Sequence, residues 1–230
     1  AKVPIVPAAI LFDLGVGDAK VRPTADCGYR AAQSATDGPV AEGDVGAGAG
    51  ASVGKLAGGA RAMKAGLGTA SITLPGGLVV AAMVAVNAVG DIIDPTTARV
   101  VAGVRTDDGK ALADARLLVR SGATLRRGGP NAGENTTIGI VATNAKLTKV
   151  QASKMAQMAH DGYARAISPV HTMGDGDTIF ALATGTLAGE PEMLAVGALA
   201  AEMMSEAIVR AATQSKGLPQ LPSASQLGGR

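Results

Sequence analysis

Blocks of apolar and polar residues alternate along the chain and predict strands and helices in turn. Continuous apolar runs at 4–14 and 78–87 are typical of buried strands, and the second, which carries no charge, predicts a strand covered on both faces. Two further stretches, 136–145 and 177–185, also read as strands.

Helical periodicity is clearest in the second half of the chain. Residues 148–167 place apolar and small residues on one face at a spacing near 3.6, namely Met155, Met158, Ala159, Gly162 and Ala166. Residues 192–213 are apolar nearly all round, which predicts a buried helix, and 28–36 is a candidate short helix. The loose alternation of strands and helices favours layered α/β architecture.

The segments between these elements differ in character. Residues 42–70 are dense in glycine and too apolar for a linker, so we expect closely packed loop backbone there. Residues 91–95 read as a turn and 105–134 as a polar linker, while the Pro/Ser/Gly-rich end from Gly217 is expected to fray. We expect residues 1–230 to form a single domain.

Composition excludes several function classes. The net charge is +2, Trp is absent and no long basic run occurs, which argues against a nucleic-acid partner. No apolar stretch is long enough to cross a membrane. The one cysteine, Cys27, excludes an intrachain disulfide, is expected to be a partly buried small hydrophobe, and fits a cytoplasmic setting. The N-terminal stretch reads as a strand entered in mid-fold, so we expect an upstream piece.

Motifs for cofactors and metals fail when tested. The glycine-rich segment 46–56 has Ala49 and Leu56 where a phosphate-binding loop needs Gly and Ser or Thr. His160 and His171 are the only histidines, and their spacing supports no metal site, so structural roles are favoured for both. We therefore expect no cofactor and no metal.

The Asn135–Thr136 junction suggests a specific chemistry. A polar, glycine-rich segment leads directly into a strand that begins with two threonines. If the chain breaks there, Thr136 gains a free α-amine with a pKa of about 7.7–8.0, which can act as base for its own hydroxyl. By composition and spacing alone, a turn that ends at Asn135 before an ordinary strand remains the commoner interpretation.

A second constellation is the segment HTMGDGDTIF at 171–180. Asp175 and Asp177 are two residues apart, so in an extended backbone they face the same side. Two such carboxylates can share a proton or hold a hydroxyl or amine. A solvated acidic turn and a calcium loop are the alternatives, although the EF-hand pattern is absent.

Several segments in order resemble the DmpA-type peptidase family, which contains L-aminopeptidase/D-amidases, β-aminopeptidases and nylon-oligomer hydrolases. The segments are VPIVPAAILFDLGVGD, RPTADCGYRAA, GAGAGASVGK, MKAGLGTAS, AVNAVGDIIDP, ENTTIGIVATNAKLT and MAHDGYARAISPVHTMGDGDTIFALATG. The resemblance implies a four-layer αββα sandwich and self-cleavage into chains 1–135 and 136–230, which assemble as an oligomer of heterodimers. The Asn–Thr junction is closest to the nylon-hydrolase branch.

The resemblance also implies roles for individual residues. Thr136 becomes the nucleophile, Asn87 lies near the oxyanion, and Lys55 assists the threonine. Asp175 and Asp177 anchor the nucleophile by hydrogen bonds.

Two further positions are less informative. Phe12 stands in the substrate pocket where many members carry Tyr, so the substrate type is left open. Lys64 matches a motif lysine whose role does not follow from the sequence.

The function expected on this basis is hydrolysis of amide bonds in small peptides, amino-acid amides or ω-amino-acid oligomers through an acyl-enzyme. Three alternatives stay open. One is acyl transfer to an amine, as in ornithine acetyltransferases. The others are a self-cleaved assembly protein without catalysis and a binding module that does not cleave itself.

Overall fold

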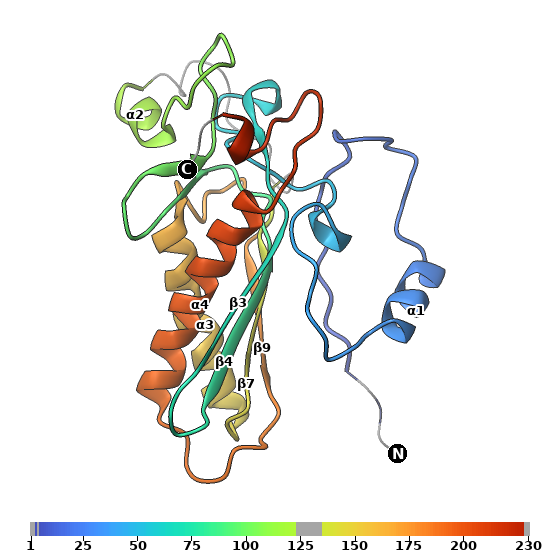
Figure 1. Ribbon diagram of the computed structural model, residues 1–230, viewed down its shortest axis with the longest axis vertical. Coiled ribbons are helices and arrows are strands. Elements are labelled where there is room, and N and C mark those ends of the chain that lie inside the picture. Colours follow the sequence, from blue (N-terminus) through green and yellow to red (C-terminus); the bar gives the residue numbers. More distant parts are fainter. Residues whose placement is uncertain (1–2, 4, 123–134, 228–230) are drawn as a thin grey trace.

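The computed structural model describes residue 3, residues 5–122 and residues 135–227. A four-stranded sheet in the order β3-β4-β7-β9 forms its centre, as Figure 1 shows. The strands are β3 (Leu67–Thr73), β4 (Val79–Ala85), β7 (Ile138–Thr143) and β9 (Thr178–Ala183). The neighbours β3/β4 and β4/β7 run antiparallel, whereas β7 and β9 are parallel.

Two long helices, α3 (Lys149–Ala166) and α4 (Met193–Thr213), pack against each other and against one face of this sheet (Figure 1). Small residues make the close packing possible. A Cβ on Gly162 would lie 2.4 Å from the Ala201 carbonyl oxygen, and one on Gly68 would lie 2.0 Å from that of Ala207. Thr148 and Gln151 form a capping box that starts α3.

Shorter elements surround one end of the sheet. They are a second sheet in the order β6-β5-β8, a two-stranded sheet of β1 and β2, and the short helical pieces η1 (Gly46–Gly48), η2 (Gly59–Arg61), α2 and η4, whereas α1 lies off to one side. Their bounds are β1 (Ser52–Val53), β2 (Met63–Lys64), β5 (Asp91–Ile93), β6 (Val100–Ala102), β8 (Ile167–Ser168), α1 (Ala25–Gln33), α2 (Ala115–Arg120) and the 3-10 turn η4 (Ala224–Gln226).

The expected α/β layering is confirmed, and the strand and helix predictions of the second half hold to within a few residues. On β4 burial alternates along the strand rather than being complete. The face of β4 turned to the helices buries Val80, Ala82 and Val84, whereas Ala81 and Met83 stay half-buried on the other face. The prediction of a strand covered on both faces is therefore wrong for these residues.

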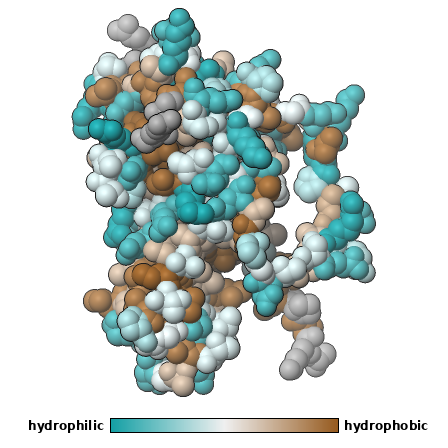
Figure 2. Space-filling model, viewed as in Figure 1, coloured by the Kyte–Doolittle hydropathy of each residue, from teal (hydrophilic) through white to brown (hydrophobic). Residues whose placement is uncertain are grey.

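Several local predictions are also corrected. Residues 5–14 form no strand: Ile5 and Ile10 are 93% and 86% exposed, and Pro7 has no N–H for a ladder. Residues 5–41 lie almost entirely on the surface, and Figures 1 and 2 show this segment with α1 standing off one side. Cys27 in α1 is exposed rather than partly buried.

The predicted turn at 91–95 begins with β5, because residues 91–93 pair with β6 and β8, and the buried Asp91 carboxylate accepts hydrogen bonds from the N–H groups of Val104 and Ala115. The predicted linker 105–134 contains α2, and its part 123–134 lies outside the described residues. Residues 217–227 are not frayed, since Leu221 and Ser223 are buried beside η4.

Candidate active site

Thr136 lies just before β7, with only 8% of its surface exposed. The Thr136 hydroxyl donates to the Asn135 carbonyl oxygen at 2.6 Å, and the Thr136 N–H donates to the Asn87 carbonyl oxygen at 2.9 Å. The candidate nucleophile is therefore held against the carbonyl of the peptide bond that it would attack.

A second donor reaches the same carbonyl. The Gly176 N–H donates to Asn135 O at 2.8 Å, and Asn135 pairs with Asp175 in a parallel bridge. A Cβ on Gly176 would lie 2.9 Å from Thr136 Oγ1, so only glycine fits there without a shift. A backbone N–H aimed at this oxygen is the arrangement that stabilises an oxyanion. Sequence reasoning missed Gly176, although it is the middle residue of the Asp-Gly-Asp motif.

Asn87 and Lys55 lie on the other side of Thr136. Lys55 Nζ donates to Asn87 Oδ1 at 2.6 Å and to Asn87 O at 3.4 Å, the same oxygen that accepts from Thr136 N–H. The Asn87 amide NH₂ donates to the backbone oxygen of Phe12 at 2.9 Å. The Asn87 side-chain amide, which is the expected oxyanion donor, thus points to Phe12 before cleavage. The Asn87 carbonyl oxygen positions the Thr136 N–H.

Phe12 is 40% exposed, and its hydrogen bond with the site is made by its backbone oxygen. The hydrogen bond from Asn87 ties the otherwise surface-exposed N-terminal segment to the region of the nucleophile.

The two aspartates have different partners. Asp177 Oδ1 accepts from the Thr137 N–H at 3.0 Å, one residue after the candidate nucleophile. Asp175 accepts from Val89 N–H and from the Thr172 hydroxyl, and so ties its own loop to the segment after Asn87. The structure brings both aspartates to the junction. Asp177 accepts from a backbone N–H and Asp175 from groups of its own loop and of the segment after Asn87, so neither contacts the Thr136 hydroxyl as expected.

Both histidines join this site, which the sequence did not predict. His171 Nδ1 lies 2.8 Å from Asp177 Oδ2, and the His171 ring packs edge-on against His160 and near Tyr163. His171 has a φ of 52°, a conformation that few non-glycine residues adopt. The Tyr163 hydroxyl donates to Thr137 O and Thr178 O, so the cluster also fixes the start of β7 against β9.

Burial shapes the charges of this cluster. Desolvation is the main cause that raises the pKa of Asp177, and the charge of Asp175 raises it further. The hydrogen bond from the Thr137 N–H and the interaction with His171 lower this pKa in part. Desolvation, followed by the neighbouring His171, lowers the pKa of His160.

Lys64 has a structural environment. Its ammonium is fully buried, donates to Gly48 O at 2.8 Å and to Ala65 O, and pairs with Asp44 at 3.0 Å. Desolvation lowers the pKa of Lys64. It therefore clamps the glycine-rich segment onto β2, and none of these partners belongs to the junction.

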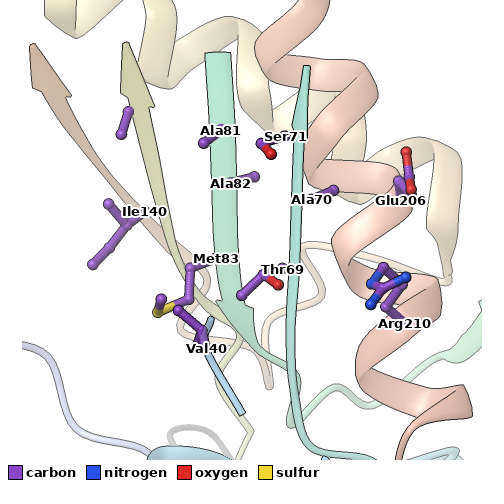
Figure 3. A pocket seen from close by; sticks show the side chains of 11 residues that line it. Val40, Thr69, Ala70, Ser71, Ala81, Ala82, Met83, Ile140, Glu206 and Arg210 are labelled. Carbon is purple, nitrogen blue, oxygen red and sulfur yellow. The ribbon is translucent and has the colours of Figure 1, made fainter. Parts of the chain in front are cut away.

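A separate groove of about 550 Å³ lies on the sheet face opposite the helices (Figure 3). Thr69, Met83 and Ile140 line its floor, with Glu206 and Arg210 of α4 at one side. None of the residues at the junction lines this groove, so its size does not identify it as the site of chemistry.

The described residues contain no group of three or more His, Cys, Asp or Glu side chains placed to hold a metal ion. None of the helices in this part of the chain combines the length and apolar character that crossing a bilayer requires.

Comparison with known proteins places this geometry in context. A family model described as "Peptidase family S58" matches residues 1–221. An uncharacterized aminopeptidase of Mycobacterium leprae is 40% identical over 96% of this chain, and the chain spans 64% of its length. A 6-aminohexanoate-oligomer endohydrolase of Kocuria sp. is 30% identical over 92% of the chain, which spans 62% of that protein.

Two solved structures of aminopeptidases have a fold similar to that of this chain. A β-aminopeptidase of Burkholderia sp. matches 84% of this chain with a TM-score of 0.56 and 29% identity, and 52% of it is covered. The L-aminopeptidase D-Ala-esterase/amidase of Ochrobactrum anthropi, described as a variant of the Ntn hydrolase fold, matches 87% of the chain with a TM-score of 0.57. At 21% identity, this second match supports the fold alone, and 53% of that chain is covered.

Proposed function

Because this chain belongs to peptidase family S58, we propose that it is a self-cleaving amidohydrolase with Thr136 as its nucleophile. One observation carries the proposal. The Thr136 hydroxyl and the Gly176 N–H both donate to Asn135 O, at 2.6 and 2.8 Å, so nucleophile, scissile carbonyl and oxyanion donor are already together.

Self-cleavage begins when Thr136 Oγ1 bonds to the Asn135 carbonyl carbon. The C–N bond breaks, the hydroxyl proton passes to the nitrogen, and an ester joins Asn135 to Thr136. Gly176 N–H stabilises the negative charge that develops on Asn135 O. Water then hydrolyses the ester and leaves Asn135 as a carboxylate and Thr136 as a free N-terminus.

The new α-amine is then the base for substrate. It lies where the Thr136 N–H now contacts Asn87 O, an oxygen shared with Lys55 Nζ. The positive charge of Lys55 favours the neutral form of this amine, which is the form that accepts a proton. Lys55 thus assists by its charge, and Asn87 assists as the acceptor that positions the amine.

Turnover repeats the same steps on a substrate amide. Thr136 Oγ1 forms an ester with the acyl group, the proton passes through the α-amine to the leaving amine, and water releases the acid. The substrates we propose are small peptides, amino-acid amides or ω-amino-acid oligomers. The relatives named as an aminopeptidase and as a 6-aminohexanoate-oligomer endohydrolase support this range.

The two products of self-cleavage, 1–135 and 136–230, are proposed to stay together as a heterodimer. Strand β7 of the second pairs with β4 of the first over six residues, and α4 packs on β3 and β4. Further assembly into oligomers of this heterodimer is part of the proposal, as is a cytoplasmic location.

A denaturing gel and an amide-hydrolysis assay test the proposal. We expect two fragments, with the smaller one beginning TTIGIV, from the unchanged protein and from Thr136→Ser. Thr136→Ala is expected to stay intact, folded and inactive. Thr137→Ala is the matched control and is expected to cut, because its buried hydroxyl has no hydrogen-bond partner. An intact unchanged protein, or cutting by Thr136→Ala, would refute the proposal.

A further inference from the structure

The side chain of Asn135 occupies a closed site next to the candidate nucleophile. Asn135 is 1% exposed, and its Nδ2 donates to the Gly174 carbonyl oxygen at 3.3 Å. Its Oδ1 is buried and has no hydrogen-bond partner. The site therefore offers an acceptor to an N–H group and leaves an amide oxygen unsatisfied, which costs free energy.

The acceptor is held firmly in place. Gly174 N–H donates to the Thr172 hydroxyl, which in turn donates to the Asp175 carboxylate at 2.6 Å. The carboxylates of Asp175 and Asp177 belong to the same loop, on either side of Gly176. Their charge favours a cationic group in this site and disfavours an anionic one.

Self-cleavage and turnover use the same hydroxyl and the same oxyanion donor. The acyl group that Thr136 attacks first is the Asn135 residue itself, with its carbonyl oxygen on Gly176 N–H. The intact chain therefore shows where an acyl group lies when its carbonyl is in the reactive position. Once Asn135 leaves as a carboxylate, a substrate acyl group can fill the same space.

We propose that the space filled by the Asn135 side chain is the acyl pocket of the mature enzyme, and that it selects acyl groups carrying an N–H donor three carbons from the carbonyl carbon. In Asn135 those carbons are Cα, Cβ and Cγ, and the donor is Nδ2. A 4-aminobutanoyl group has the same spacing. It also lacks the amide oxygen that the pocket leaves unsatisfied, and its ammonium suits the neighbouring carboxylates.

This inference rests on the proposed function, because it assigns the substrate of the same site. In the reaction, Thr136 Oγ1 bonds to the carbonyl carbon of the 4-aminobutanoyl group and the bond to the leaving amine breaks. The hydroxyl proton goes to that amine, and water then hydrolyses the ester.

The first test is a series of p-nitroanilides, measured as kcat/KM on the self-cleaved protein. The acyl groups are 3-aminopropanoyl, 4-aminobutanoyl, 6-aminohexanoyl and pentanoyl, the last matching 4-aminobutanoyl in length but without the N–H. We expect 4-aminobutanoyl to exceed pentanoyl by about tenfold or more, the effect of one hydrogen bond from a charged donor. It should also exceed the shorter and longer amines. Equal rates for 4-aminobutanoyl and pentanoyl, or a maximum at another length, would overturn the proposal.

The second test needs no external substrate. Asn135→Leu keeps the branched shape but removes the donor, and Asn135→Asp replaces the donor by a negative charge. Both are expected to slow self-cleavage by about tenfold or more relative to the unchanged protein. The melting temperature of each substitution, measured together with Thr136→Ala, shows that the intact fold is retained.

The two tests separate the pocket from the activity. If self-cleavage of Asn135→Leu is slow but no anilide is hydrolysed, the space binds residue 135 only. That result would refute both its role as a substrate pocket and the hydrolysis of small amides. Self-cleavage of Asn135→Leu at the unchanged rate would overturn the pocket, whatever the anilides show. Absence of self-cleavage in the unchanged protein would overturn both.

Discussion

Substituting Gly176 by alanine should disturb the position of the Thr136 hydroxyl and slow self-cleavage, with little effect on the stability of the fold. The new methyl would lie 2.9 Å from Thr136 Oγ1, closer than a carbon and an oxygen approach without a shift. Thr136 is β-branched and buried, so its hydroxyl can retreat only by leaving its rotamer. We therefore expect slower self-cleavage and slower turnover.

The size of the effect follows from two limits. If only the Thr136 side chain moves, the cost is that of an off-rotamer torsion, about 0.5–1.5 kcal/mol. If the Gly176 N–H is also displaced from Asn135 O, an oxyanion donor is lost, at about 2.7–4 kcal/mol. The expected slowing of self-cleavage therefore lies between about twofold and about 700-fold, since 1.4 kcal/mol corresponds to tenfold.

The assay is the time course of self-cleavage on a denaturing gel, started by refolding the intact chain. Gly76→Ala is the matched control, because a Cβ there would meet no atom within 4 Å. Gly76→Ala should melt at the temperature of the unchanged protein, and Gly176→Ala no more than a few degrees lower, because the strain at Thr136 is small. Self-cleavage of Gly176→Ala at the rate of Gly76→Ala would refute the placement of Gly176 N–H and Thr136 Oγ1 at the reacting carbonyl.

Three further predictions concern titratable groups. His171→Asn removes an interaction that lowers the pKa of Asp177, and asparagine tolerates the left-handed backbone at this position. The acid limb of the kcat/KM profile should therefore move to higher pH. An unmoved limb would contradict a role for ionised Asp177. Burial raises the pKa of Asp91 from 3.8 to about 6, so its contribution to stability is present below pH 3.8 and is lost as pH rises to about 6, by about 3 kcal/mol. Denaturant unfolding across this range should show that loss in the unchanged protein relative to Asp91→Asn, and parallel curves would count against it. Lys64→Met should lower the free energy of unfolding by about 3 kcal/mol while self-cleavage of the folded chain continues, and equal denaturation midpoints would rule out the proposed clamp.

The local pattern of the sequence determined much of the central layer. Helices α3 and α4 follow from 3.6-residue periodicity and caps, and strands β4, β7 and β9 from short apolar runs between turn residues. These signals lie within single segments, so they can be read without knowing the rest of the chain. The Asn135–Thr136 junction was likewise visible, because a polar segment meets a strand there.

The exposure of the N-terminal segment could not be predicted from the sequence pattern in the same way. The apolar run at 4–14 has the composition of a buried strand, yet residues 5–14 lie on the surface. Burial depends on whether another element comes to cover a segment, and hydrophobicity along the chain does not contain that information.

The tertiary structure alone decided how the site is built. The parallel pairing of β7 with β9 brings Gly176 and Asp177 to a junction about forty positions earlier in the sequence, Gly176 N–H to Asn135 O and Asp177 to Thr137 N–H. Such contacts depend on strand register, and a shift of one residue would turn each side chain to the other face of the sheet. Spacing within the Asp-Gly-Asp motif predicted two carboxylates side by side, but register gave each its own partner and placed the N–H of the glycine between them on the Asn135 carbonyl oxygen.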